Sequence, residues 1–302
     1  MAGSLVVQAH EGHEHPPAGK VVTSVQVTGN GQFTFETVPG FGAMPEGVNV
    51  GPTHGGVAVD SAGDVYVSTE ADHGVVKFGP DGKFKKSFGP STKALHSLAL
   101  TKDGDKEVLV GAAVSAKKVL KLDLEGKTLL TISNENTGEI KGGLGGVTGV
   151  AVGPQGHFYV VCGYGSNLIH KFDATGKLVK SAGGRGKGDG QFQTCHGIAL
   201  DTRSGSPLLL ICDRENRRLV HFGLDLNFKG VHTTHLRRPC AASVRGDYVV
   251  VAELEGRVTI VGKNGEVMAF LGDQPDRGLW AKKPVPEDKL FDGLFTSPHG
   301  VS

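Results

Sequence analysis

The stretch that decides the fold is TCHGIALD at residues 194–201, followed by the apolar run LLLICD at 208–213 and the polar loop DREN at 213–216. The first motif recurs as a short apolar strand with a polar residue, often histidine, at its start. Its other copies are THGGVAVD at 53–60, LHSLALTKDG at 95–104, VTGVAVGPQG at 147–156, RPCAASVRGD at 238–247 and SPHGVS at 297–302. Self-similarity of this kind predicts one structural unit copied several times.

The segments between the copies indicate what that unit is. A second apolar strand follows each of the first five copies, which start at 53, 95, 147, 194 and 238. After it come a polar loop and a third strand, and a tight turn then leads into a fourth strand. In the unit that begins at 147 the later strands are FYVVCG, IHKFDATGK and LVKSAG. Four short antiparallel strands are the content of a propeller blade, and they fit a solenoid poorly. With 47 glycines for the many turns, the chain is predicted to be all-β.

Six copies predict a six-bladed β-propeller, formed as a single domain by residues 20–302. The sixth copy ends at Ser302, which leaves no room for the rest of its blade. Residues 20–38 alternate apolar and polar side chains around a Gly-Asn-Gly turn, the pattern of a β-hairpin. We expect this hairpin to pair with SPHGVS and complete the last blade; the alternative is a sixth blade that is truncated.

Composition excludes some functions. The chain has 32 Lys and Arg against 31 Asp and Glu, so no charge excess favours nucleic acid or an anionic membrane. No apolar run approaches the ~20 residues needed to span a bilayer. The four cysteines lie in or beside apolar strands without metal-binding spacing, which predicts buried free thiols.

Residues 1–19 are predicted to be a disordered, histidine-rich leader. They contain HEGHEH at 10–15, which is either a metal-binding tract or a solvated tail. The segment looks like the end of a removed signal or a linker, which favours an extracytoplasmic location, periplasmic or secreted.

The residues at the start of the six copies form the candidate site. In a propeller the innermost strands run side by side around the axis, so equivalent positions form a ring. Three histidines occupy alternate places of this ring, and three converging imidazoles are a ligand set of catalytic zinc, with one position left open. They would also accept copper, nickel or iron. A histidine at such a place can instead only cap its strand. In chain order the ring is His54, His96, Thr148, His196, Cys240 and His299.

The units resemble NHL repeats, and residues 149–222 resemble the peptidyl-α-hydroxyglycine α-amidating lyase family. The resemblance rests on CGYGSN at 162–167, GQF at 190–192, the strand that starts at His196 and the DREN loop. It implies zinc held by His96, His196 and His299. It also implies cleavage of a carbinolamide to an amide and glyoxylate, on a small molecule or a peptide C-terminus.

The resemblance also assigns two further roles. Tyr164 would take a proton, because a tyrosine beside a divalent cation can act as a base, and Arg214 would hold the substrate carboxylate. Each has an alternative: Tyr164 as a packing lid, and Arg214 as the ion-pair partner of Glu215.

The sequence departs from that family in three places. Residues 44–56 contain no arginine where the family has a second one. Ser297 replaces a methionine, and Gly300 replaces an acidic residue tied to calcium, so calcium is not expected here. A related lyase or hydrolase with another substrate therefore stays open.

Four other residues are candidates for supporting roles. His54 and Cys240 belong to the ring and could be extra ligands or could contact ligands or substrate; packing is the alternative for Cys240. Glu70 and Glu253 lie in comparable loops and could be acids or further ligands. Two other functions remain open: a non-catalytic NHL propeller that binds a protein or ligand, and a lactonase-like metal-dependent hydrolase, whose ion would prefer oxygen ligands.

Overall fold

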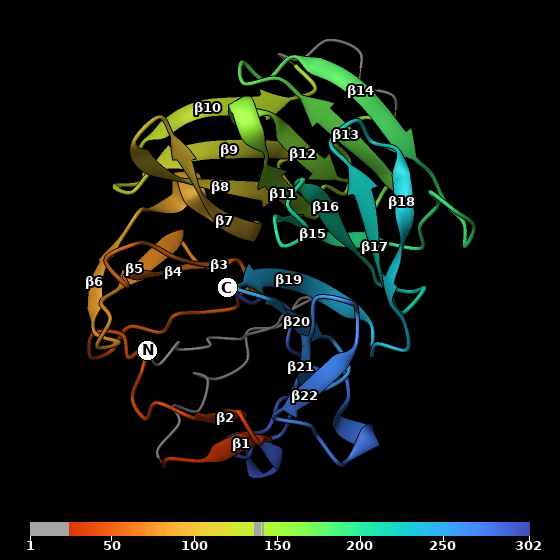
Figure 1. Ribbon diagram of the computed structural model, residues 1–302. Helices are drawn as coiled ribbons and strands as arrows, with labels where there is room; N and C mark the ends of the chain where they lie inside the picture. Colours follow the sequence, from red (N-terminus) through yellow and green to blue (C-terminus); the bar gives the residue numbers. More distant parts are fainter. Residues whose placement is uncertain (1–23, 136–139, 141) are drawn as a thin grey trace.

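The computed structural model describes residues 24–135, 140 and 142–302, and within them the chain forms five four-stranded antiparallel sheets (Figure 1). In every sheet the strands pair in the order in which they follow along the chain. The first two sheets contain β3 (Val57–Val59), β4 (Val65–Ser68), β5 (Val75–Phe78) and β6 (Phe84–Ser87), and β7 (Leu95–Asp103), β8 (Lys106–Ala113), β9 (Lys118–Asp123) and β10 (Thr128–Ser133). The other three contain β11 (Gly149–Val152), β12 (Phe158–Val161), β13 (Leu168–Phe172) and β14 (Leu178–Gly183); β15 (Cys195–Asp201), β16 (Leu208–Asp213), β17 (Arg218–Gly223) and β18 (Phe228–Thr233); and β19 (Pro239–Arg245), β20 (Tyr248–Glu253), β21 (Arg257–Val261) and β22 (Val267–Leu271).

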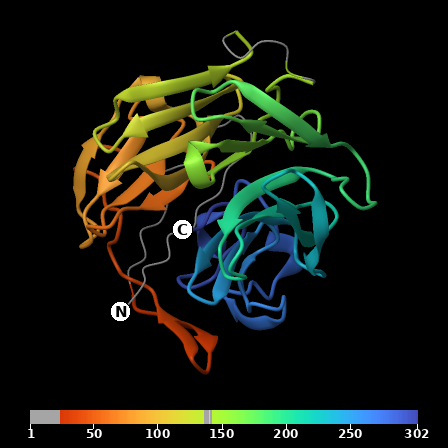
Figure 2. The same cartoon turned by 45° about the horizontal axis from the view of Figure 1, so that its top comes forward.

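These sheets are the blades of a β-propeller, numbered one to five in chain order, and their first strands surround the centre (Figures 1 and 2). Apolar side chains from neighbouring blades pack together; between blades three and four, Val161, Ile169, Leu209 and Ile211 are fully buried. The alternation of apolar residues along each strand thus supplies the core between blades.

In several copies, a glycine directly follows the starting residue, such as His196 or His299. This glycine lets the backbones of neighbouring blades approach closely near the propeller centre. A Cβ atom at Gly197 would overlap the backbone carbonyl of Cys240, and one at Gly300 would overlap the carbonyl of Gly55. The repeated His-Gly and Thr-Gly pairs therefore have a physical cause: at these points, backbone of the next strand occupies the space of a side chain.

The sixth blade differs from the prediction. Between blades one and five lies a two-stranded sheet, β1 (Val27–Asn30) and β2 (Phe33–Glu36), so the expected hairpin exists (Figure 1). Residues 297–302 form no strand and no ladder with it. Within the described residues, five blades rather than six are present as four-stranded sheets, and residues 297–302 do not pair with β1 or β2 as expected. The hairpin instead packs against the outer strand of blade five.

Helix is limited in the described residues to short 3-10 turns, and no helix there is long and apolar enough to cross a membrane. The turns are η1 (Pro90–Thr92), η2 (Pro154–Gly156), η3 (Arg277–Leu279) and η4 (Glu287–Lys289). All four cysteines are buried free thiols, as predicted. The histidine-rich leader, residues 1–19, lies outside the described residues.

Candidate metal centre

Three histidines from three parts of the chain meet at the centre of the propeller. His96 lies on β7, His196 on β15 and His299 near the C-terminus. Their exposed fractions are 3%, 2% and 2%, and one ring nitrogen from each lies within 4.8 Å of the other two. The ring spacing predicted from the sequence thus brings these side chains together.

Backbone carbonyls set the tautomers of two of the rings. Nδ1 of His96 donates to the carbonyl of Thr148 at 2.8 Å, and Nδ1 of His196 donates to the carbonyl of Cys240, also at 2.8 Å. A neutral imidazole that donates from Nδ1 has its lone pair on Nε2. Nε2 of His299 is buried and has no hydrogen-bond partner among the described residues. The Nε2 lone pairs of His96 and His196 are therefore directed into the cluster, where the buried Nε2 of His299 lies without a hydrogen-bond partner among the described residues.

Burial keeps the three imidazoles neutral. It is the main cause that lowers the pKa of His96 to about 3, with the charge of His54 as the next cause. Burial also lowers the pKa of His196 and of His299 well below the usual value, and repulsion among the histidines adds to this. Neutral imidazole is the form that binds a transition metal.

Tyr164 and Arg214 lie at the same centre. The Tyr164 hydroxyl is 2.9 Å from Nε2 of His196 and 3.2 Å from Nε2 of His96, and Nη1 of Arg214 donates to it at 3.2 Å. Arg214 also donates from Nε to Glu215 at 3.0 Å, so its predicted ion pair exists alongside the contact with Tyr164. Tyr164 is 36% exposed, whereas Arg214 is 7% exposed. A phenol held between imidazoles and a guanidinium can exchange a proton, because the guanidinium stabilises the phenolate.

His54 and Glu70 form a pair beside the trio. Nδ1 of His54 contacts the Glu70 carboxylate. The ring centre of His54 lies 5.3 Å from that of His96 and 6.3 Å from that of His299. His54 is therefore a neighbour of the three histidines, at the more exposed side of the cluster.

Cys240 and Glu253 have other partners. Cys240 orients His196 through its backbone carbonyl, while burial raises the pKa of its thiol to about 11. Glu253 is fully buried and accepts hydrogen bonds from the Arg257 side chain and the Thr259 hydroxyl. Glu253 thus contributes to the inside of blade five, and neither residue belongs to the group of converging ligand atoms.

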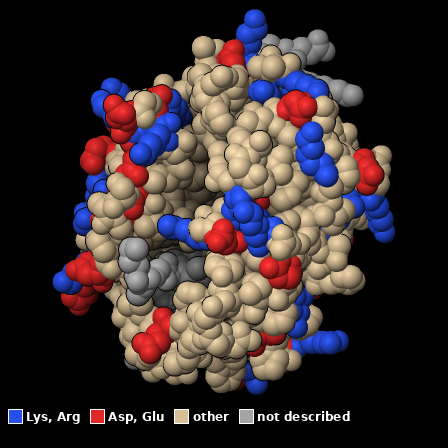
Figure 3. Space-filling model, in the orientation of Figure 1, with Lys and Arg blue, Asp and Glu red and all other residues tan. Residues whose placement is uncertain are grey.

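The first strands of the blades enclose a central channel of about 360 Å³, and the three histidines form part of its lining. Figure 3 shows one face of the molecule, with acidic and basic side chains interspersed around a central hollow. The channel walls combine aliphatic side chains with polar groups, which include Ser243 and Arg245 as well as the three histidines. Its lining includes Val57, Leu98, Val150, Ile198, Val244 and Val301.

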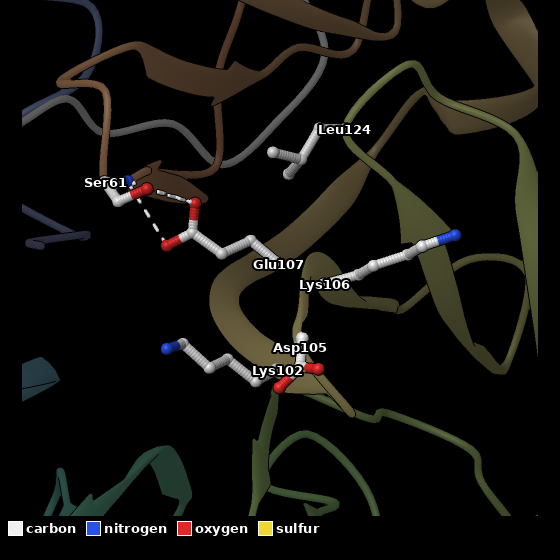
Figure 4. A pocket seen from close by; sticks show the side chains of 6 residues that line it. All are labelled: Ser61, Lys102, Asp105, Lys106, Glu107 and Leu124. Carbon is white, nitrogen blue, oxygen red and sulfur yellow. Dashed lines mark hydrogen bonds between the residues drawn. The ribbon is translucent and has the colours of Figure 1, made fainter.

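A second hollow, of about 420 Å³, lies between the turns of blades one and two (Figure 4). There the Ser61 hydroxyl donates to Glu107 at 2.7 Å, and Lys102, Asp105 and Lys106 line the rim. Its charges have both signs and none belongs to the histidine cluster, so it offers no chemistry comparable to the first site.

Two features of the site could not be recognised from the sequence. The carbonyls of Thr148 and Cys240 orient the histidines, but every residue has a carbonyl, so the residue type carries no signal. The other is Lys283, whose charge contributes to the lowered pKa of His96 and His299, behind the effect of burial. The unusually long interval between Cys240 and His299 was the available hint of an added loop.

No protein-family model matches this sequence, and no curated protein sequence matches it. Solved structures do match by fold. A streptogramin B lyase structure has a TM-score of 0.57 at 14% identity, over 82% of this chain and 87% of that one. A virginiamycin B lyase from Staphylococcus aureus has a TM-score of 0.53 at 17% identity, over 76% and 72%. The structure of a nidogen/laminin complex has a TM-score of 0.54 at 14% identity, over 82% of both chains. These similarities support a β-propeller fold.

Proposed function

We propose that this protein is a metal-dependent lyase that cleaves an α-hydroxyglycine-type carbinolamide to an amide and glyoxylate. The observation that carries the proposal is the convergence of His96, His196 and His299, with tautomers set by backbone carbonyls and an orphaned Nε2 on His299. This donor set fits zinc, because three neutral imidazoles are a known ligand set of catalytic zinc sites. The fold itself accommodates lyases, since two of the similar structures are lyases.

The reaction needs a base, an anion-binding group and polarisation of the substrate hydroxyl. Zinc, when bound, would supply the polarisation as a Lewis acid. Tyr164, as the tyrosinate that Arg214 stabilises, takes the hydroxyl proton; the carbon–oxygen double bond forms as the carbon–nitrogen bond breaks, and the Tyr164 phenol returns the proton to the nitrogen to give the amide. The Arg214 guanidinium also pairs with the substrate carboxylate.

Metal analysis tests this proposal. We expect the full-length protein, purified without added metal or reconstituted with zinc, to hold one equivalent and to release glyoxylate from N-benzoyl-α-hydroxyglycine. His196→Ala should lose most of the metal and of the activity, because it removes one of three ligands. His235→Asn is a matched control, since His235 is exposed.

Two results would overturn the proposal. A wild-type protein that binds no metal in titration would exclude the metal site, and full metal occupancy in His196→Ala would show that the ligand assignment is wrong. Metal binding without turnover would favour the alternative of a non-catalytic NHL propeller.

A further inference from the structure

One arginine side chain joins blade four to blade five, away from the three histidines at the centre. Arg203 lies in the turn between β15 and β16, and its side chain is almost fully buried. Its Nη1 donates to the carbonyls of Asp247 at 3.3 Å and Gly262 at 3.2 Å, which belong to two turns of blade five. Asp201 holds the guanidinium in place, since it accepts from Nε at 2.9 Å and from Nη2 at 2.7 Å. We call these contacts the Arg203 joint.

Two histidines of blade four complete the Arg203 joint. Nε2 of His221, on β17, donates to Asp201 at 2.9 Å, and Nη2 of Arg203 donates to Nε2 of His232, on β18, at 3.2 Å. The two imidazole rings lie 4.6 Å apart, measured between their centres. Because a guanidinium can only donate, its contact with His232 needs a lone pair on Nε2. His232 is therefore neutral in this arrangement, with its proton on Nδ1.

The surroundings of His232 disfavour a second proton on its ring. The charged or titratable groups that act on it come from both blades: His221 on β17, Asp201 at the end of β15, Arg203 in the β15–β16 turn and Glu266 in the β21–β22 turn. Lys229 on its own strand and Lys263 in the blade-five turn are exposed. Burial is the main cause that lowers the pKa of His232 to about 4, and the charges of His221 and Arg203 lower it further. Asp201 and Glu266 act in the opposite direction but do not prevail.

We propose that the Arg203 joint is a pH-sensitive switch: a proton on Nε2 of His232 breaks the contact with Arg203 and loosens the attachment of blade four to blade five. Asp201 prevents the guanidinium from turning away, so a protonated His232 would place an N–H group and a positive charge directly against it. The switch is independent of the proposed lyase activity. Blade five also carries Cys240, whose carbonyl orients His196, so a loosened joint would disturb the centre of the propeller as well.

The direction of the pH dependence follows from the two states of His232. In the open joint its pKa has the ordinary value of about 6.5, whereas in the closed joint it is about 4. Closure is therefore fully favoured above pH 6.5 and is lost as the pH falls from 6.5 toward 4. Since opening takes up one proton in this window, the equilibrium constant for opening should rise about tenfold for each pH unit.

Hydrogen–deuterium exchange of the full-length protein at pH 7, 6 and 5 tests the switch, after correction for the intrinsic exchange rate at each pH. The reporter is the blade-five turn in which the N–H of Gly265 donates to the carbonyl of Gly262 at 3.1 Å. We expect its opening to increase as the pH falls. The corresponding turn of blade three, closed by the N–H of Gly176 on the carbonyl of Asp173 at 3.0 Å, is the internal reference and should not follow this dependence.

His232→Gln separates the switch from general weakening in acid. The glutamine carbonyl can accept the hydrogen bond of Arg203 but does not titrate in this range, so opening of the blade-five turn should no longer depend on pH. His235→Gln is the matched control, because it removes an exposed histidine three residues away and should behave like wild type. A tenfold rise per pH unit that persists in His232→Gln, or its absence from wild type, would overturn the inference.

A titration of the wild-type histidine rings by NMR tests the same inference without a variant. We expect the His232 signal to have a midpoint of about pH 4 and to show the proton on Nδ1 at pH 7, while the exposed His235 titrates in the ordinary range. A His232 that titrates together with His235, or that carries its proton on Nε2 at pH 7, would show that Arg203 does not hold it neutral.

Discussion

His96 shows how the burial that suits a residue to the proposed metal site can also weaken the protein in acid. Its imidazole is 3% exposed, donates to Thr148 and has a pKa lowered to about 3, mainly by burial. The metal-free site therefore holds a neutral base in a place where protonation is unfavourable. The same burial that prepares the nitrogen for a metal also links folding to pH.

We predict that the metal-free protein loses stability as the pH falls from about 6.5 toward 3. In this range the unfolded chain binds a proton at His96 that the folded chain does not, so stability rises with pH by about 1.4 kcal/mol per pH unit for such a histidine. Urea unfolding of wild type and His96→Gln at pH 7 and pH 5 measures the effect. The variant should show a shallower dependence, by about one proton; identical slopes would contradict the buried, neutral state of His96.

At the residue scale, the sequence indicated which side chains meet at the centre better than which backbone groups orient them. The structure brings the three histidines, Tyr164 and Arg214 together, and repeat position and motif pointed to them because both carry information about residue type. The backbone carbonyls that orient His96 and His196 were not predicted, because a backbone carbonyl has no sequence signature. Glu253 shows the reverse case: an acid at a suggestive place in the repeat is used inside blade five.

At the level of strands, glycine determines how closely β15 and β19 approach. Gly197 follows His196, and a Cβ atom there would overlap the carbonyl of Cys240 and crowd Ala241. The same Cys240 carbonyl accepts the hydrogen bond of His196. The spacing of two strands and the orientation of one ligand thus depend on the same contact, so a change in one must disturb the other.

Gly197→Ala should therefore weaken both the fold and the proposed metal site. The added methyl group must push β19 away from β15, and overpacking of this kind costs about 1–3 kcal/mol. Urea unfolding should show that loss, and zinc titration should show weaker binding. Gly145→Ala is the matched control, because a Cβ atom there meets nothing within 4 Å. If Gly197→Ala bound zinc as tightly as wild type, the spacing of β15 and β19 would not control the orientation of His196, and the prediction would be wrong.

The strands themselves were predictable because each blade repeats the same alternation, with turns that glycine and asparagine mark. The loop that carries Lys283 was not, because it belongs to no repeat and its course depends on the contact between Trp280 and Arg237. Interactions between segments distant in sequence thus account for what the pattern of strands could not predict.

At the scale of the whole molecule, the sequence left undecided how the ring of blades closes between its first and last members. Six starting motifs predicted six blades, but a motif shows only that a first strand is encoded, and residues 297–302 form no strand. The space between blades one and five contains the β1–β2 hairpin, which is bound to blade five. The N–H of Gly272 donates to Thr28 at 2.6 Å, and the Phe33 ring meets Tyr248 edge-on at 4.9 Å.

We predict that the hairpin contributes to the stability of the whole propeller through Phe33. This side chain also packs against the buried cluster of blade five that consists of Val258, Ile260, Ala269 and Leu271, so Phe33→Ala should lower the free energy of unfolding by about 2 kcal/mol, less than for a fully buried phenylalanine. Urea unfolding measures it, and Glu36→Ala, an exposed position on the same strand, should change little. If the hairpin were only an appendage, Phe33→Ala would unfold at the same urea concentration as wild type. Because blade five also carries Cys240, whose carbonyl orients His196, a destabilised edge should be accompanied by earlier loss of zinc during unfolding.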